Sequence, residues 1–103
     1  MTILDKRDFY KPFSYPWAFD YYRQQLKLHW IPDEVPMQSD ISDWKHNMTE
    51  AEKNLLMHIF RFFTQADTDV AKGYAQFYLP KLSCHPEVTQ MLTTFASFEA
   101  IHV

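Results

Sequence analysis

The sequence predicts an all-α fold, and three observations support this prediction. Only one glycine occurs among 103 residues, while aromatic residues make up 17% and charged residues 22%. This composition is typical of a globular, helix-rich chain and not of a disordered one. The stretch TEAE gives Thr49 and Glu52 the spacing of a helix capping box. Pro80 and Pro86 bracket a short turn between two long stretches of helix-forming residues,.

The first half of the chain predicts an arm, a helix and a connector. Residues 1–16, which include Pro12 and Pro16, predict an irregular N-terminal arm. Residues 17–29 predict the first helix, which the proline of WIPDEVP ends because a residue before proline leaves the helical region. Residues 32–48 contain prolines, aspartates and serines, so they predict a connector,.

The second half predicts two long helices joined by a turn. One begins at the capping box and runs to Tyr78, ending at Pro80. The other begins at Pro86, where the missing N–H of proline is tolerated, and runs to the last residue. Since neither cap, glycine nor proline follows His102, we expect residues 1–103 to be the N-terminal part of a single helical domain in a longer polypeptide.

Composition also excludes several classes of function. Cys84 is the only cysteine, so an internal disulfide and a zinc site of paired cysteines are excluded,. No apolar run approaches the roughly 18 residues of a membrane span, and the stretch MTILDKRDFYKPF contains no apolar h-region,. A net charge of −3 without a Lys/Arg cluster argues against nucleic-acid binding,. We therefore expect a soluble, cytoplasmic protein that binds neither membrane nor nucleic acid.

Glu99 and His102 are expected on the apolar face of the last helix. At about 100° per residue, Val88, Leu92 and Phe95 lie within about 40° of Glu99, and His102 lies about 60° from it. Burying an ionised carboxylate is costly, so such a residue needs a cation, a metal or a hydrogen-bond network.

Asp67 presents the same problem in the preceding helix. The residues on its face form an apolar stripe: Leu56, Phe60, Phe63, Val70 and Tyr74. Asp69 lies on the opposite, polar face with Asn54, His58, Arg61, Gln65 and Lys72. Asp67 is therefore the candidate for burial, and Asp69 is expected at the surface.

The two helices are expected to pack antiparallel and to bring these groups together. Asp67 and Glu99 lie at similar distances from the turn near Leu82, about 15 and 17 residues. Carboxylate and imidazole ligands suit iron or manganese, and an inward Glu-x-x-His is typical of dimetal carboxylate proteins. The alternative is a metal-free core in which hydrogen bonds satisfy Glu99 and His102, and Asp69 stays open as an alternative ligand.

The remaining aromatic, histidine and cysteine side chains have simpler interpretations. Trp30 can be a core aromatic that seats the first helix, and packing is the predicted role of an aromatic stripe formed by Phe60, Phe62, Phe63 and Phe95. Four histidines at helix ends, in loops or on the polar face receive no role, and the same applies to the only cysteine: His29, His46, His58, His85 and Cys84.

Three stretches carry a resemblance to a known family: LHWIPDEV, FRFFTQAD and FASFEAIHV. In their order and separation they resemble the small, radical-generating subunit of class I ribonucleotide reductase, with PDE in place of the usual glutamate pair. The resemblance implies a ferritin-like helical bundle. It also implies that Asp67 and His102 bind one metal, that Glu99 bridges two metals, and that Trp30 takes part in electron transfer.

The function implied by the resemblance is that of an oxidoreductase subunit. It would activate an oxidant at a dinuclear iron or manganese centre and pass an oxidising equivalent to a large catalytic subunit. That subunit reduces ribonucleoside diphosphates to deoxyribonucleotides for DNA replication. We expect the small subunit to form a homodimer. We also expect residues 1–103 to be active only together with the rest of the polypeptide and the catalytic subunit. The other ligands and the radical tyrosine of many members correspond to positions after Val103. The alternatives are another ferritin-like dimetal oxidase or iron-handling protein, and a metal-free helical interaction module.

Overall fold

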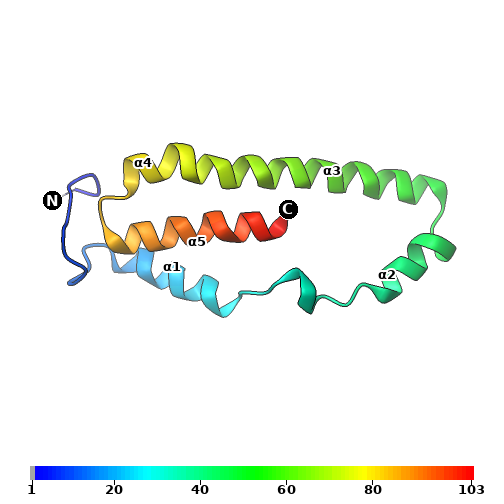
Figure 1. The fold of residues 1–103 in the computed structure, drawn as a ribbon, viewed down its shortest axis with the longest axis horizontal. Helices are drawn as coiled ribbons and strands as arrows, with labels where there is room; N and C mark the ends of the chain where they lie inside the picture. Colours follow the sequence, from blue (N-terminus) through cyan, green and yellow to red (C-terminus); the bar gives the residue numbers. More distant parts are fainter. Residues whose placement is uncertain (1) are drawn as a thin grey trace.

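The computed structural model describes residues 2–103, which form helices joined by short turns, with no strand among them. The predicted all-α class is therefore confirmed. Figure 1 shows the order of the elements. The α-helices are α1 (Pro16–Lys27), α2 (Gln38–Ser42), α3 (Glu50–Gly73), α4 (Leu79–Leu82) and α5 (Pro86–His102). A 3₁₀ turn, η1 (Pro32–Glu34), and two π-helical turns, η2 (Asp43–Asn47) and η3 (Tyr74–Tyr78), complete them.

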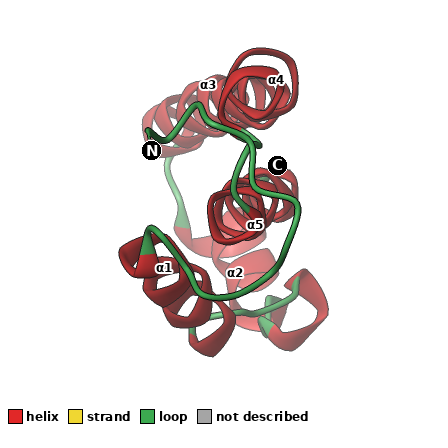
Figure 2. Ribbon diagram, turned by 90° about the vertical axis from the view of Figure 1, so that its left-hand side faces the viewer, coloured by secondary structure: helices red, strands yellow, loops and turns green. Residues whose placement is uncertain are grey.

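Helix α5 lies between α1 and α3 and packs against both (Figure 2). Helix α3 and α5 run antiparallel, as predicted, because α4 and a short turn reverse the chain (Figure 1). The core consists of Ala18 from α1 and Val88, Met91 and Leu92 from α5. The core therefore lies at the end of the bundle where α5 begins.

The beginnings of α3 and α5 follow the sequence signals. The Thr49 hydroxyl accepts a hydrogen bond from the Glu52 amide at 3.2 Å, and the Glu52 carboxylate accepts one from the Thr49 amide at 2.8 Å. This confirms the predicted capping box. Pro86 stands in the first turn of α5, so the predicted start of the last helix is also confirmed.

The path from α3 to α4 differs from the prediction of one helix ending at Pro80. Helix α3 ends at Gly73, the chain widens into the π turn η3, and α4 then includes Pro80 in its first turn. A proline is tolerated there because its N–H would have no helical partner. The proline therefore begins a new helical segment and does not end the old one.

The first helix and the connector also differ in detail. Helix α1 ends at Lys27, two residues before the predicted end, because Leu28 leaves the helix and closes it with its amide. The predicted connector contains three short helical turns. Local side-chain hydrogen bonds stabilise them, such as the one at 2.8 Å from Asn47 Nδ2 to Asp43 Oδ1,.

The N-terminal arm is irregular, as predicted, and it is fastened to α5 by a buried ion pair. Arg7 and Glu87 have side chains that are 1% and 0% exposed, and the Arg7 guanidinium pairs with the Glu87 carboxylate. The other Glu87 oxygen accepts hydrogen bonds from the Ser14 and Tyr15 amides, each at 2.9 Å. Burial would raise the pKa of Glu87, but hydrogen bonds from the Tyr15 amide, its own amide and Arg7 outweigh it, so the pKa is lowered,.

His85 also belongs to this junction, although no role was predicted for it. Its side chain is completely buried, packs edge-to-face on the Tyr15 ring at 4.9 Å, and places Nε2 3.2 Å from the Thr2 carbonyl oxygen. His85 therefore helps to hold the arm over the start of α5.

The described chain is elongated, with extents of 59 × 25 × 16 Å and a radius of gyration of 18.7 Å. A compact domain of 100 residues has a radius of about 13 Å. Helix α3 extends beyond the end of α5 (Figure 1), and three members of the predicted apolar stripe are exposed. Phe60 is 59% exposed, Phe63 53% and Val70 44%. Among the described residues, none of the helices combines the length and apolarity that crossing a membrane requires.

Candidate metal centre

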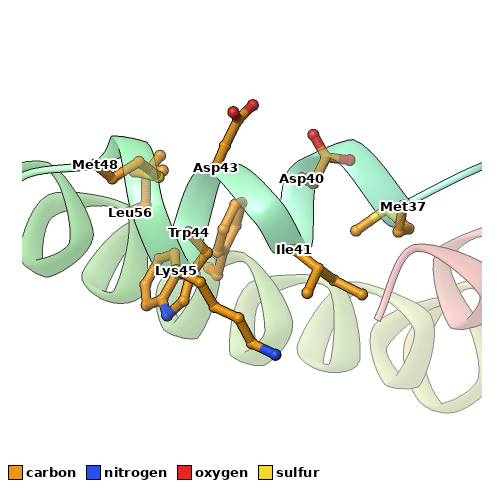
Figure 3. Close-up of a pocket in the computed structure, with 9 residues that line it drawn as sticks. Met37, Asp40, Ile41, Asp43, Trp44, Lys45, Met48 and Leu56 are labelled. Carbon is orange, nitrogen blue, oxygen red and sulfur yellow. The ribbon is translucent and has the colours of Figure 1, made fainter.

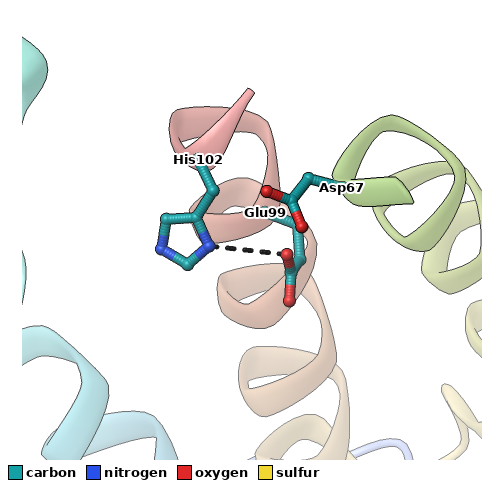
Figure 4. Close-up of side chains that lie close together, drawn as sticks. All are labelled: Asp67, Glu99 and His102. Atoms are coloured by element: carbon teal, nitrogen blue, oxygen red, sulfur yellow. Dashed lines mark ion pairs between the residues drawn. The ribbon is translucent and has the colours of Figure 1, made fainter. Parts of the chain in front are cut away.

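Asp67 from α3 and Glu99 and His102 from α5 come together in the structure (Figure 4). Each offers one ligand atom, and these atoms all lie within 4.8 Å of one another. The antiparallel packing of α3 and α5 produces this meeting, because both helices are connected through the same short reversal. The predicted convergence of the three side chains is therefore confirmed.

Glu99 and His102 are paired within α5. His102 Nδ1 lies 3.4 Å from Glu99 Oε2, across one turn of the helix (Figure 4). Residues three apart on a helix are neighbours on its surface, so this contact follows directly from the Glu-x-x-His spacing. The Asp67 carboxylate approaches the pair from α3 (Figure 4).

The burial of the site is only partial, which corrects the prediction. Val88 and Leu92 are buried, as expected of the apolar face of α5. Asp67 and Glu99 are half-buried, and the His102 side chain is 43% exposed. The prediction that His102 is buried was therefore wrong for the described residues. The loop after α1 contacts this last turn of α5 through the Trp30 ring and leaves the imidazole partly exposed.

Asp69 lies outside the cluster, as predicted. Its side chain is exposed and accepts a hydrogen bond at 3.0 Å from Gln65 Nε2, one turn away on the polar face of α3. Asp69 therefore serves as a matched surface aspartate for comparison with Asp67.

Trp30 lies beside the cluster and not in the core. Its indole ring is 41% exposed and stacks on the His102 ring, with centroids 5.9 Å apart and planes inclined by 20°. The interpretation of Trp30 as a core aromatic was therefore wrong. The structure instead joins the loop after α1 to one member of the candidate site.

Tyr74 is a neighbour of the site for which sequence analysis predicted only packing. It is half-buried in η3, and its ring lies 6.1 Å from that of Phe95. Burial raises the pKa of Tyr74, and the Glu99 charge and Tyr78 raise it further,. Its phenol is therefore neutral at pH 7. The sequence signal for this proximity is that Tyr74 lies on the same side of the predicted helix as Asp67.

The charge of the cluster is not balanced by a basic side chain. Among the described residues, neither Asp67 nor Glu99 forms an ion pair with a lysine or arginine, and Glu99 pairs only with His102. Two carboxylates and one imidazole around a small volume are a donor set that fits iron or manganese. The residues present are thus suited to hold such an ion.

A larger groove of about 520 Å³ lies elsewhere, between α2, η2 and the first half of α3 (Figure 3). The carboxylates of Asp40 and Asp43 point away from α3 in this view. Most of the other lining side chains are apolar: Met37, Ile41, Trp44, Met48, Leu56 and Phe60. The groove lacks a cluster of potential metal ligands, so the Asp67 site is the candidate functional site of the described residues.

Helical packing with carboxylate and histidine ligands on facing helices defines a class of metal-binding bundle proteins. Residues 7–103 match the family model described as ribonucleotide reductase, small chain. The chain therefore belongs to the ribonucleotide reductase small-chain family, and the expected all-α, ferritin-like fold agrees with this membership.

Individual relatives agree with this assignment. Over all 103 residues the chain is 45% identical to a probable ribonucleoside-diphosphate reductase small subunit of Invertebrate iridescent virus 6. Over the same 103 residues it is 43% identical to a probable ribonucleoside-diphosphate reductase small subunit of Invertebrate iridescent virus 3. Over 92 residues, 88% of the chain, it is 32% identical to ribonucleoside-diphosphate reductase subunit beta of Chlamydia pneumoniae. The chain spans 28%, 27% and 26% of these relatives.

Proposed function

We propose that this chain is part of a small subunit of ribonucleoside-diphosphate reductase that generates an oxidising equivalent at a dinuclear iron or manganese centre. A large catalytic subunit would use that equivalent to reduce ribonucleotides to deoxyribonucleotides. The observation that supports the proposal best is the convergence of Asp67, Glu99 and His102 within 4.8 Å in a member of this family.

Each member of the cluster would have a defined task. Asp67 and His102 would hold one metal ion, and Glu99 would be a ligand to both ions of the centre. When bound, the metal ions of such a centre would supply the electrons that reduce dioxygen or a related oxidant. Carboxylates suit this chemistry because they are hard anionic ligands that stabilise high oxidation states.

The surrounding side chains would orient and shield the site. The Glu99 carboxylate beside His102 Nδ1 restrains the imidazole ring,. The Tyr74 ring packs edge-to-face on Phe95 beside Glu99 and would help to exclude water, and the neutral Tyr74 phenol adds no charge.

Trp30 would connect the site to the catalytic subunit. Its indole ring stacks on the proposed ligand His102, so an electron that passes between the site and the partner has a short path through these two rings. Homodimerisation of the small subunit is part of the same proposal, and the exposed apolar side chains of α3 are compatible with burial in a larger assembly,.

Metal analysis of the full-length polypeptide tests the proposal. Loading with Fe(II) or Mn(II) without oxygen should give bound metal, and oxidation in the presence of the large subunit should give deoxyribonucleotide formation. Asp67→Ala, Glu99→Ala and His102→Ala should each lose metal, while Asp69→Ala should retain it.

The contrary outcomes separate the alternatives. Absence of metal from the wild-type protein, or unchanged metal content in all three variants, would contradict the proposal and favour a metal-free interaction module. Bound metal that consumes dioxygen without supporting deoxyribonucleotide formation would favour a ferritin-like oxidase or iron-handling protein.

A further inference from the structure

Two consecutive residues after α1 stack on two successive turns of α5. The His29 ring stacks on Phe98 with centroids 5.3 Å apart, and Trp30 stacks on His102 at 5.9 Å. Both pairs of planes are inclined by 20°. Because Phe98 and His102 are four residues apart, they lie on one face of α5. The loop therefore contacts α5 through two ring stacks, one at each of these positions.

The backbone around Trp30 is fixed on both sides. On the α1 side, the Leu28 amide donates to the carbonyl oxygens of Gln24 and Gln25 at 3.3 and 3.1 Å. On the η1 side, the Ile31 amide donates to Glu34 Oε2 at 3.2 Å. Between these points lie only His29, whose amide donates to the Leu26 carbonyl oxygen at 3.4 Å, and Trp30, so the two ring stacks fix the rest of the loop's contact with α5.

The Trp30 ring has room to reorient if the path of the loop beside α5 changes. Its side chain is exposed, and a hollow of about 120 Å³ borders it. The residues that line the hollow include His29, Trp30, Phe98 and His102. Tight packing does not hold the indole, so its orientation depends on the stack with His102 and on the position of the backbone beside it.

We propose that His29 is a positioning residue, which stacks on Phe98 and thereby holds Trp30 parallel to the His102 ring. This role depends on the flat aromatic shape of the His29 ring and does not depend on whether the imidazole is protonated. The geometric part of the inference concerns only side chains of this chain. Its consequence for electron transfer through Trp30 rests on the proposed function.

The geometric part is tested in metal-free, full-length protein. In a background where Trp17, Trp44 and every other tryptophan except Trp30 are phenylalanine, acrylamide quenching of Trp30 emission reports its exposure. His29→Ala should raise the quenching constant about twofold, because the indole loses its fixed stack. His29→Phe should restore the parent value, since phenylalanine can stack on Phe98.

Controls decide whether the effect belongs to the stack. His58→Ala, at an exposed histidine on α3, should leave quenching unchanged, and circular dichroism should show equal helix content in all variants. Phe98→Ala should reproduce His29→Ala, and the double variant should add nothing further. Unchanged quenching in His29→Ala, or a failure of His29→Phe to restore it, would overturn the inference.

The functional part is tested with metal-loaded protein and the large subunit. His29→Ala should lower kcat for deoxyribonucleotide formation about tenfold with an unchanged nucleotide KM, because the nucleotide binds to the large subunit. His29→Phe should restore kcat. A changed quenching constant with unchanged kcat would overturn the link to electron transfer. Failure of the wild-type protein to bind metal would contradict the proposed function, while the quenching experiment would still decide the role of His29.

Discussion

Arg7 and Glu87 lie 80 positions apart in the sequence and form a buried ion pair. The Arg7 guanidinium also donates to the carbonyl oxygens of Phe9, Tyr10 and Pro12 at 3.1, 3.1 and 2.7 Å. Glu87 stands in the first turn of α5, where the helix dipole favours a negative charge,. The pair therefore joins the whole turn of the N-terminal arm to the helix that carries Glu99 and His102.

Removing one partner of this pair should destabilise the protein strongly. Arg7→Ala leaves the Glu87 charge buried without its cation, so we expect a loss of about 3–5 kcal/mol in the free energy of unfolding, measured with urea. The double variant Arg7→Met/Glu87→Leu should lose less. Lys6→Ala is the control, because Lys6 pairs with Asp8 in full exposure, and its stability should not change,. Equal losses for Arg7→Ala and Lys6→Ala would contradict this prediction.

The same pair predicts a pH dependence of stability. The pKa of Glu87 lies below its ordinary value of 4.5 in the folded state. The stabilisation is therefore complete above pH 4.5 and is lost as the pH falls through the lower, folded-state pKa. Urea midpoints between pH 7 and pH 3 should fall less steeply in Glu87→Gln than in the wild-type protein. Identical slopes would show that Glu87 is not coupled to folding.

Metal binding should stabilise the folded protein by an amount that rises with the logarithm of the metal concentration above Kd. Because Asp67 and Glu99 approach one another without a lysine or arginine partner, a bound cation would relieve their repulsion. Mn(II) at 100 times its Kd should add about 2.7 kcal/mol, visible as a rise in Tm that a chelator reverses. Asp67→Ala should show no rise, and Asp69→Ala should behave as wild type. A similar rise in both variants would assign the effect to non-specific binding.

Gly73→Ala should stabilise the protein. Gly73 ends α3 with helical backbone angles, and a Cβ added there would meet nothing within 4 Å. Alanine in place of a helical glycine contributes about 0.5–1 kcal/mol. Urea unfolding measures the gain, and Ala71→Gly, two residues earlier in the same helix, should give a comparable loss. A loss of stability in Gly73→Ala would indicate that the neighbouring π turn needs the freedom of glycine.

Much of the site could be predicted because helical periodicity and a short reversal determine it. The spacing of Asp67 within an apolar stripe, and of Glu99 and His102 within another, placed all three on facing sides of α3 and α5. The capping box at Thr49 and the first-turn proline at Pro86 located the beginnings of these helices, since such signals act within one turn.

The other features of the fold depend on long-range contacts, which helical periodicity in the sequence does not reveal. Arg7 lies in an irregular arm, so nothing local relates it to Glu87, and the burial of His85 follows from the same long-range packing. The prediction of one helix as far as Tyr78 contains neither the π turn at Tyr74 nor the helical segment Leu79–Leu82, since a proline fits the first turn of a helix as well as its end,.

The order in which the elements are synthesised differs from the order in which they can pack. Helix α1 leaves the ribosome early, yet its packing partner is α5, and Val88, Met91 and Leu92 of the core follow about 70 residues later,. Contacts of such long sequence separation form late in folding. The arm and α1 therefore remain without their packing partner until α5 has been synthesised, and the Arg7–Glu87 ion pair can form only then.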